Sequence, residues 1–451
     1  MKKLLVMLMI LALLIVGAAG CAKESAPEST QTDTQVSQEA TEQATQAEAT
    51  QEAEEKDPVK LTFWYTASEG DESDVVYRFQ HENVALFMEA NPYVEIEEFI
   101  LGGNAKDYRA KLLTEAAAGF VPDVFMTWHG GNTQPMVDAG LLMPLDDIVA
   151  ADPELKDTLK QSNLTLATYD GTLYGLVDTV DAIGYFYNKS IFESLGLTLP
   201  GTYEELLSVS ETMMENDIVP MALGLSPSNW MGSLAWQMVF MQQNSLDKYQ
   251  SDIVEGNIDY SEQAYIDAMK ITQELALKGY YGDSINSIDG NETRAMFVDG
   301  KTAFWLSGTW ALSGLYEAMG DDVGFMTFPS VDGNDPSYMI AASKGFALSK
   351  DAPQEAVDFL KFIYSKDRQS KYAEMGVFIS LQNVDYDTSA LPAVMSDIGE
   401  QLKNSKKTFV IWGDLLPVDM TPDLFSGIQE IMEGADVEET LNYIQELNAG
   451  R

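Results

Sequence analysis

The strongest constraint on the fold is the order of strand-like and helix-like segments that starts at residue 59. Strand-like segments alternate and are rich in branched and aromatic side chains, whereas helix-like segments place apolar side chains three and four residues apart. The sequence predicts strands over residues 59–65, 93–100 and 123–128, and helices over residues 74–90 and 106–118. Successive β-α-β units predict a parallel-type sheet flanked by helices. Ligands bind such sheets at the carboxyl ends of the strands, here after Tyr65 and after Phe125.

A second block of mixed structure begins near residue 184. Residues 185–187 are strand-like, and Thr202 with Glu205 forms a capping box at the start of a helix. Further helices are predicted over residues 262–276, 293–299, 354–364 and 422–433. Residues 58–451 are long for one hydrophobic core, so this α/β chain is expected to form two domains.

The N-terminal residues are expected to lie outside these domains. Lys2 and Lys3 precede an apolar run over residues 4–16 that is short for a membrane span, which is typical of a secretory signal over residues 1–20. Ala18-Ala19-Gly20-Cys21 resembles a bacterial lipobox, in which the cysteine is lipidated, although alanine stands where leucine is usual. The alternative is ordinary signal cleavage with an incidental cysteine. Because Cys21 is the only cysteine, no internal disulfide is expected.

The segment over residues 21–57 is predicted to be a disordered tether. Its polar composition, with no aromatic residue, cannot bury enough apolar surface to form a core. Its end-to-end distance would be about 30 Å. The signal, Cys21 and the tether together predict a protein held by acyl chains at the extracellular face of a bacterial membrane.

The charge and the residue types exclude several classes of function. A formal net charge of −44 disfavours nucleic acid and other polyanions as ligands. The only two histidines are His81 and His129, so a zinc site with His or Cys ligands is not expected, and no metal or cofactor is predicted. The sequence has no nucleophile motif. A glycosidase would need two placed carboxylates, and no pair stands out among 71 acidic residues.

Several sequence blocks together resemble the extracellular solute-binding proteins, family 1, of ABC sugar importers. The blocks are Gly140 to Asp147, Asp170-Gly171-Thr172-Leu173-Tyr174-Gly175-Leu176, Tyr187-Asn188-Lys189, Gly300-Lys301-Thr302-Ala303 with Gly308-Thr309-Trp310, and Gly345-Phe346-Ala347-Leu348-Ser349. The resemblance implies a two-lobed periplasmic-binding-protein-like fold that traps its ligand by hinge closure. The crossovers would lie near residues 179–184, 340–345 and 390–398. Lobe 1 would then combine residues 58–180 and 341–392, and lobe 2 residues 184–339 and 393–451.

The resemblance also places candidate sugar contacts. Trp310 matches a sugar-stacking tryptophan of the maltodextrin-binding members, and Asp181 matches an acidic position that contacts sugar. The alternatives are a core tryptophan and a solvated acid. Aromatic faces and carboxylates are what a pyranose ring and its hydroxyls require. Trp128 and His129 follow the third predicted strand, where relatives have a ligand loop, although Gly130 replaces the aspartate that some of them carry.

The remaining candidates come from the predicted strand ends and crossovers. Trp64, Tyr65 and Glu69 lie at the end of the first strand, where alternation allows only one of the two aromatic rings to face a ligand. Asn229 and Trp230 are second-lobe loop residues that either contact ligand or pack in the loop. Trp412 is a late-loop candidate, and Lys344 either donates to a sugar hydroxyl or stays solvated. Trp236 and Trp305 are expected in the core.

The sequence therefore predicts a non-enzymatic, monomeric receptor for a neutral carbohydrate, with an oligosaccharide favoured, that serves an ABC permease. The alternative is a receptor of the same fold for a polyamine or another cation, favoured by the acidic excess and by Asp178, Asp181 and Glu69. A surface glycosidase is a third hypothesis, from a different class.

Overall fold

The computed structural model describes residues 56–449 apart from 73, 103–104, 161–163, 227–229, 243–257, 332, 334–337, 377–383, 386, 388–390, 406 and 413–420. The predicted signal, Cys21 and nearly all of the predicted tether lie outside these residues, as does Asn229. Within the described part of the chain, no helix is both long enough and apolar enough to cross a membrane.

Nine of the described strands form one mixed sheet, in the order β2-β1-β3-β10-β6-β8-β7, with β11 beside β10 and β9 beside β6. Their bounds are β1 (Val59–Tyr65), β2 (Val94–Ile100), β3 (Val124–Thr127), β6 (Leu176–Asn188), β7 (Val219–Ala222), β8 (Thr302–Gly308), β9 (Val323–Met326), β10 (Tyr338–Leu348) and β11 (Lys407–Val410). The short strands β4 (Thr168–Tyr169) and β5 (Thr172–Leu173) form a separate pair.

The predicted parallel pairing is present among the first three strands, and it recurs between β7 and β8 and between β10 and β11. β1 runs parallel to both β2 and β3, as β-α-β units require. β10 then lies antiparallel to both β3 and β6, so the sheet as a whole is mixed. The difference arises because β10 comes from a distant part of the chain and not from the next β-α-β unit.

Helices flank the sheet, and several of them begin at a side-chain cap. The described α-helices are α1 (Val75–Ala90), α2 (Ala105–Ala117), α3 (Gln134–Asp138), α4 (Asp146–Ala151), α5 (Pro153–Thr158), α7 (Lys189–Leu195), α8 (Tyr203–Glu215), α9 (Trp230–Phe240), α11 (Gln263–Leu277), α12 (Gly290–Val298), α13 (Leu312–Met319), α14 (Gln354–Ile363), α15 (Lys366–Glu374), α16 (Ala393–Asn404), α18 (Thr421–Met432) and α19 (Val437–Ala449). The Asp74 side chain accepts hydrogen bonds from the first turn of α1, and Thr202 with Glu205 forms the predicted capping box of α8.

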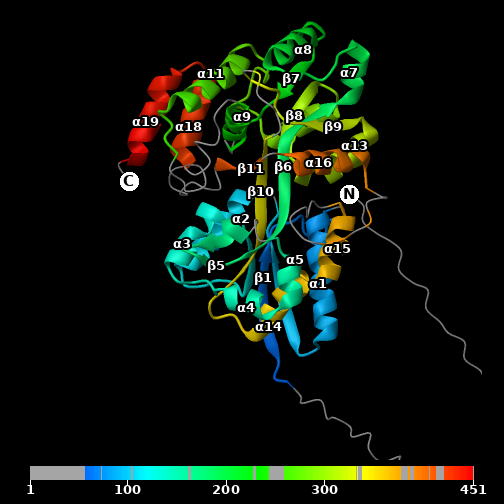
Figure 1. Cartoon of the computed structure of the whole chain (residues 1–451), viewed down its shortest axis with the longest axis vertical. Helices are drawn as coiled ribbons and strands as arrows, with labels where there is room; N and C mark the ends of the chain where they lie inside the picture. The colour runs from blue at the N-terminus through cyan, green and yellow to red at the C-terminus, as the bar shows by residue number, and fades with distance from the viewer. Residues whose placement is uncertain are drawn as a thin grey trace, which may run out of the picture. The chain divides into compact units, whose positions relative to one another are not determined.

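Two large hydrophobic cores lie along this sheet, and β6 and β10 belong to both. Leu176 and Phe346 pack in the core around β1, whereas Ile183 and Ile340 pack in the core around β8. Figure 1 shows β6 and β10 as long neighbouring strands that run from one group of elements to the other. This arrangement is compatible with the two predicted lobes, whose boundaries remain predictions.

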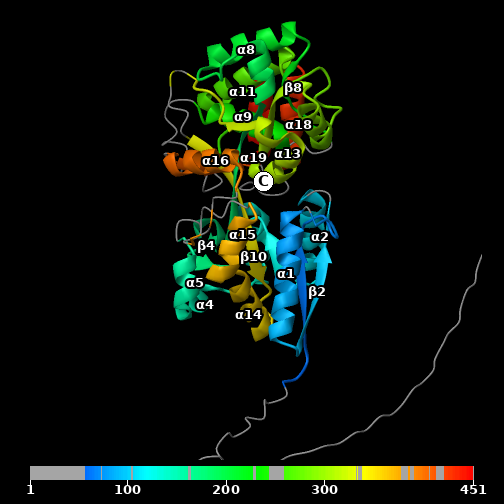
Figure 2. The ribbon, with the colours of Figure 1, turned by 90° about the vertical axis from the view of Figure 1, so that its right-hand side faces the viewer.

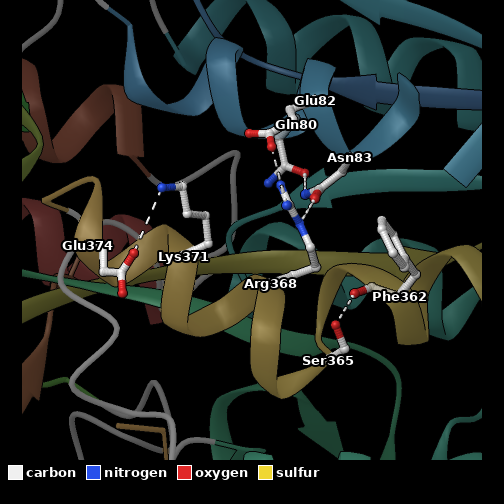
Figure 3. A network of polar contacts seen from close by, with 8 residues as sticks. All are labelled: Gln80, Glu82, Asn83, Phe362, Ser365, Arg368, Lys371 and Glu374. Carbon is white, nitrogen blue, oxygen red and sulfur yellow. Dashed lines mark hydrogen bonds and ion pairs between the residues drawn. The ribbon is translucent and has the colours of Figure 1, made fainter. Parts of the chain in front are cut away.

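A polar network centred on Arg368 fixes α15 against α1 (Figure 3). The Arg368 side chain is mostly buried; its Nε donates to Asn83 Oδ1, and its guanidinium lies 5.1 Å from the centre of the Phe79 ring. Tyr372, one turn further along α15, stacks on the same Phe79 ring at 4.0 Å. Figure 2 shows α15 beside α1, and Tyr372 packs with Phe79 in one small hydrophobic cluster between the two helices.

Candidate functional site

Strands β6, β8 and β10 bring three polar side chains of the candidate site together. Asp181 on β6 is 8% exposed, and its Oδ1 accepts a hydrogen bond of 2.9 Å from Thr309 Oγ1, just after β8. Lys344 on β10 is half-buried and lies opposite Thr179 in the register with β6. Burial raises the pKa of Asp181, while the Lys344 charge and the Thr309 hydrogen bond act in the opposite direction. Asp181 and Lys344, predicted separately, thus share one neighbourhood.

Two tryptophans form an aromatic surface next to this polar group. Trp310 directly follows Thr309 and is 43% exposed, so it is not a core residue. Its ring lies over Gly308, where a Cβ atom would come within 2.0 Å of the ring, so only glycine fits there. Trp230, the first residue of α9, lies 6.0 Å from Trp310 between ring centres, at an interplanar angle of 54°. An exposed ring with a half-buried ring beside it, next to hydroxyl-binding groups, is suited to stacking on a ligand.

The carboxyl end of β3 provides a half-buried aromatic residue, Trp128. The Arg109 guanidinium on α2 lies 4.2 Å from the centre of the Trp128 ring, and Tyr108 meets that ring edge-on. The Tyr108 hydroxyl donates to Trp64 O and Met126 O, which ties the ends of β1 and β3 together. One side of the Trp128 ring is therefore already covered by a cation.

His129 is buried, and its Nε2 lies 3.4 Å from Leu176 O. Burial lowers its pKa to about 4, so the ring is neutral at physiological pH. A Cβ atom at Gly175 would lie 2.3 Å from the His129 ring, so this glycine lets the ring approach the chain. His129 therefore packs beneath the loop after β3, against Gly175 and Leu176.

The end of β1 differs from the prediction that one of its two aromatic rings faces a ligand. Tyr65 is fully buried, and its hydroxyl donates to Glu98 Oε1 at 2.7 Å. Trp64 is 7% exposed and packs on Phe99 with 4.3 Å between ring centres. Phe99 and Phe120 cover the Trp64 ring, and Phe63 packs against the Tyr65 ring, so both candidates are corrected to core residues. Glu69 is exposed in the turn that follows.

Trp412 is also corrected from a ligand-contact candidate to a core residue. It has no exposed surface, and its ring meets Trp236 edge-on with 4.9 Å between ring centres. Phe240 and Tyr265 pack against the same ring. The core placement of Trp236 and Trp305 is confirmed, since they are 0% and 5% exposed.

Sequence reasoning missed Thr309 and Arg109. Thr309 could have been found from its position directly before Trp310, whereas no signal marks Arg109 as the partner of Trp128. In the part of the chain that the structure describes, no group of three or more His, Cys, Asp or Glu side chains could hold a metal ion.

Comparison with known proteins finds relatives that match most of this chain. An osmoprotective compounds-binding protein of Synechocystis is 24% identical over 342 residues, which cover 73% of this chain and 80% of the relative. The solved structure of a chitin oligosaccharide binding protein matches with a TM-score of 0.78 and 23% identity, over 88% of this chain and 99% of the other. A Streptococcus pneumoniae solute-binding protein in complex with the blood group A-trisaccharide matches with a TM-score of 0.71 and 19% identity, over 87% and 100% of the two chains.

These structural matches confirm the predicted two-domain α/β fold. The relatives are binding proteins and not enzymes. The family model for the bacterial extracellular solute-binding protein matches residues 69–370, which are more than half of the sequence. The chain therefore belongs to the bacterial extracellular solute-binding proteins, the family to which its sequence blocks pointed.

Proposed function

We propose that this protein is a lipid-anchored receptor that captures a neutral carbohydrate, with an oligosaccharide favoured, and delivers it to an ABC permease. The observation that carries the proposal is the exposed Trp310 ring, which lies beside Trp230 and directly follows the Thr309 that binds Asp181. The apolar face of a pyranose ring stacks on such an aromatic surface. The Asp181 carboxylate accepts hydrogen bonds from sugar hydroxyls, and the Lys344 ammonium donates one.

The printed names of the similar proteins support a carbohydrate ligand. Two of the solved structures described above concern a chitin oligosaccharide and a trisaccharide. The Synechocystis relative binds osmoprotective compounds, a class that does not by itself specify a sugar. Trp128, with Arg109 behind its ring, would supply a contact from the other predicted lobe, so that closure would bring both lobes against the ligand.

Isothermal titration of the purified domain against monosaccharides, oligosaccharides, amino acids and polyamines tests this function. We expect saturable heat with one or more carbohydrates, and tighter binding of an oligosaccharide because it can cover both tryptophans. The affinity should change little with ionic strength, since stacking and hydroxyl hydrogen bonds involve no ligand charge. Heat with amino acids or polyamines alone would contradict the carbohydrate proposal.

A cationic solute is the second candidate, because Asp178 and Asp181 on β6 lie near the single ammonium of Lys344. The chain's net charge of −44 would attract such a ligand over long distances. In the same titrations, its affinity would fall steeply as salt is raised. A salt-dependent polyamine isotherm would therefore favour this candidate over the first.

The lipid anchor at Cys21 has a separate test. Mass spectrometry of the protein from bacterial membranes is expected to find diacylglycerol on Cys21, and Cys21→Ser is expected to release the receptor into the medium because it removes the acylated thiol. Cys21→Ser protein that stays in the membrane fraction to the wild-type extent would contradict lipid anchoring. Sugar titration of the released variant is the control, and its affinity should equal that of the wild type.

A further inference from the structure

The strands that connect the two cores carry an irregularity at Asp178. Lys344 on β10 lies opposite Thr179 on β6, but the next residue, Gly345, lies opposite Val177. Asp178 is therefore the extra residue of a β-bulge and has no pairing partner on β10. Bulges re-aim a side chain and occur often beside functional sites.

The Asp178 carboxylate is an unusual group to find at this position. The side chain is fully buried, and neither oxygen accepts a hydrogen bond of good geometry from the described residues, although the neighbouring Thr179 hydroxyl and amide lie close enough to lower the pKa of Asp178. An ionised carboxylate that is buried without a well-formed hydrogen bond is strongly disfavoured unless it takes a proton or lies near a positive charge. The titratable groups that face it are Lys344 on β10, Asp181 on β6, Tyr364 after α14 and Tyr372 on α15.

Asp178 and Asp181 thus share one ammonium group. Lys344 stabilises both carboxylates, and each carboxylate disfavours the ionised form of the other. With both ionised, the group of three carries one excess negative charge inside the protein. Burial raises the pKa of Asp178 to about 7, so Asp178 gains and loses its negative charge near physiological pH.

We propose that Asp178 is a positioning residue for ligand capture, which takes up a proton when a neutral ligand binds. The positive charge of Lys344 then compensates the Asp181 carboxylate alone. This inference rests on the proposed function. A neutral ligand that covers the half-buried Lys344 and the remaining exposed part of Asp181 removes water from them, so the excess negative charge becomes more costly. A proton on Asp178 removes that charge. The ionised Asp181, held by Thr309 and compensated by Lys344, then accepts a ligand hydroxyl.

Titration calorimetry with the best-binding carbohydrate tests the proposal by two readouts. The wild-type affinity is expected to fall between about pH 6 and about pH 8, roughly tenfold for each unit by which the ligand raises the pKa of Asp178. At neutral pH, the observed heat should vary with the ionisation enthalpy of the buffer, as it does when a proton is taken up. Both effects should be absent in Asp178→Asn, which keeps the shape of the side chain but cannot titrate.

Two further variants separate this role from a merely structural one. Asp170→Asn changes an exposed carboxylate in the turn before β5, at a φ of 49° that asparagine tolerates, and should keep the wild-type pH dependence. Lys344→Gln removes the charge that lowers the pKa of Asp178, so the midpoint of the pH dependence should move upward. This shift tests the proposal even if Asp178→Asn does not fold.

The contradicting outcomes are distinct. Asp178→Asn with unchanged pH dependence, or wild-type binding without proton exchange, overturns the role of Asp178. Proton release on binding overturns the neutral-ligand mechanism and favours a cation. Absence of binding by every carbohydrate at every pH overturns the proposed function itself.

Thermal unfolding then tests the titration of Asp178 without a ligand. The pKa of this carboxyl rises from 3.8 to about 7 on folding, so the contribution of Asp178 to stability is fully present below pH 3.8 and is lost as the pH rises to about 7. Asp178→Asn should lack this loss. His129 has the opposite effect, since its lowered pKa reduces stability as the pH falls below 6.5, but it is present in both proteins and cancels in the comparison. Equal pH profiles of wild type and variant would show that Asp178 does not titrate in this range.

Discussion

Replacement of Trp310 by alanine is expected to weaken carbohydrate binding by about 30- to 1,000-fold, which corresponds to roughly 2–4 kcal/mol for an aromatic residue that dominates a binding surface. The ring is 43% exposed, lies over Gly308 and beside Trp230, and belongs to neither large core, so its removal should leave both cores intact. The melting temperature without ligand should therefore stay within a few degrees of the wild-type value. Titration calorimetry and thermal unfolding of the same preparation provide both measurements.

The matched control is Tyr443→Ala. Tyr443 is another exposed aromatic residue, 61% accessible, on α19 near the C-terminus. Its removal should change neither the affinity nor the melting temperature. If Trp310→Ala binds its sugar as tightly as Tyr443→Ala does, stacking on Trp310 is not the basis of recognition.

Replacement of Trp412 by alanine is expected to lower the free energy of unfolding by about 3–5 kcal/mol, the usual cost of emptying a fully buried aromatic site. The ring lies among Trp236, Phe240 and Tyr265, and the variant would leave a cavity between them. Urea unfolding measures the loss. The affinity for sugar should be unchanged under conditions where the variant is fully folded.

Trp412→Phe makes this test sharper. The Trp412 Nε1 has no hydrogen-bond partner among the described residues, so phenylalanine loses only part of the ring volume and no hydrogen bond. We expect it to recover most of the stability that alanine loses. Normal stability together with lost sugar binding in Trp412→Ala would restore the original prediction of a ligand contact.

The sequence was sufficient to locate the local structure where a repeating pattern and a cap coincide. Residues 59–65 form β1 as predicted, and α1 starts one residue after Asp74, whose side chain caps it. The capping box at Thr202 was predicted and is present. These features depend on neighbouring residues alone.

The length of β6 was underestimated, since only residues 185–187 were predicted and the strand starts at Leu176. Its polar residues Asp178, Thr179 and Asp181 interrupt the apolar pattern, and the long strand is stabilised by β10, far away in the sequence.

The candidate site shows the same limit. Trp310 and Asp181 were predicted from blocks that resemble a family. In the structure they lie near each other because Thr309, the residue before Trp310, donates a hydrogen bond to Asp181. The burial of Trp412 could not be predicted, because its covering partners Trp236, Phe240 and Tyr265 come from helices far away in the sequence. The bulge at Asp178 was equally hidden, since it exists only in the pairing of two distant strands.

The pairing of β6 with β10 has a mechanical consequence. Independent linkers could bend one at a time, but two of the three predicted crossovers lie on β6 and β10, which are paired with each other from Leu176–Phe346 to Ile183–Ile340. Because the two strands are paired, we expect them to twist together when the two cores reorient. The bulge is the natural point for that twist, since it already increases the local right-handed coil of the ribbon. Backbone amides on either side of Asp178 should therefore stay protected from hydrogen exchange whether or not ligand is bound, with the change confined to the bulge.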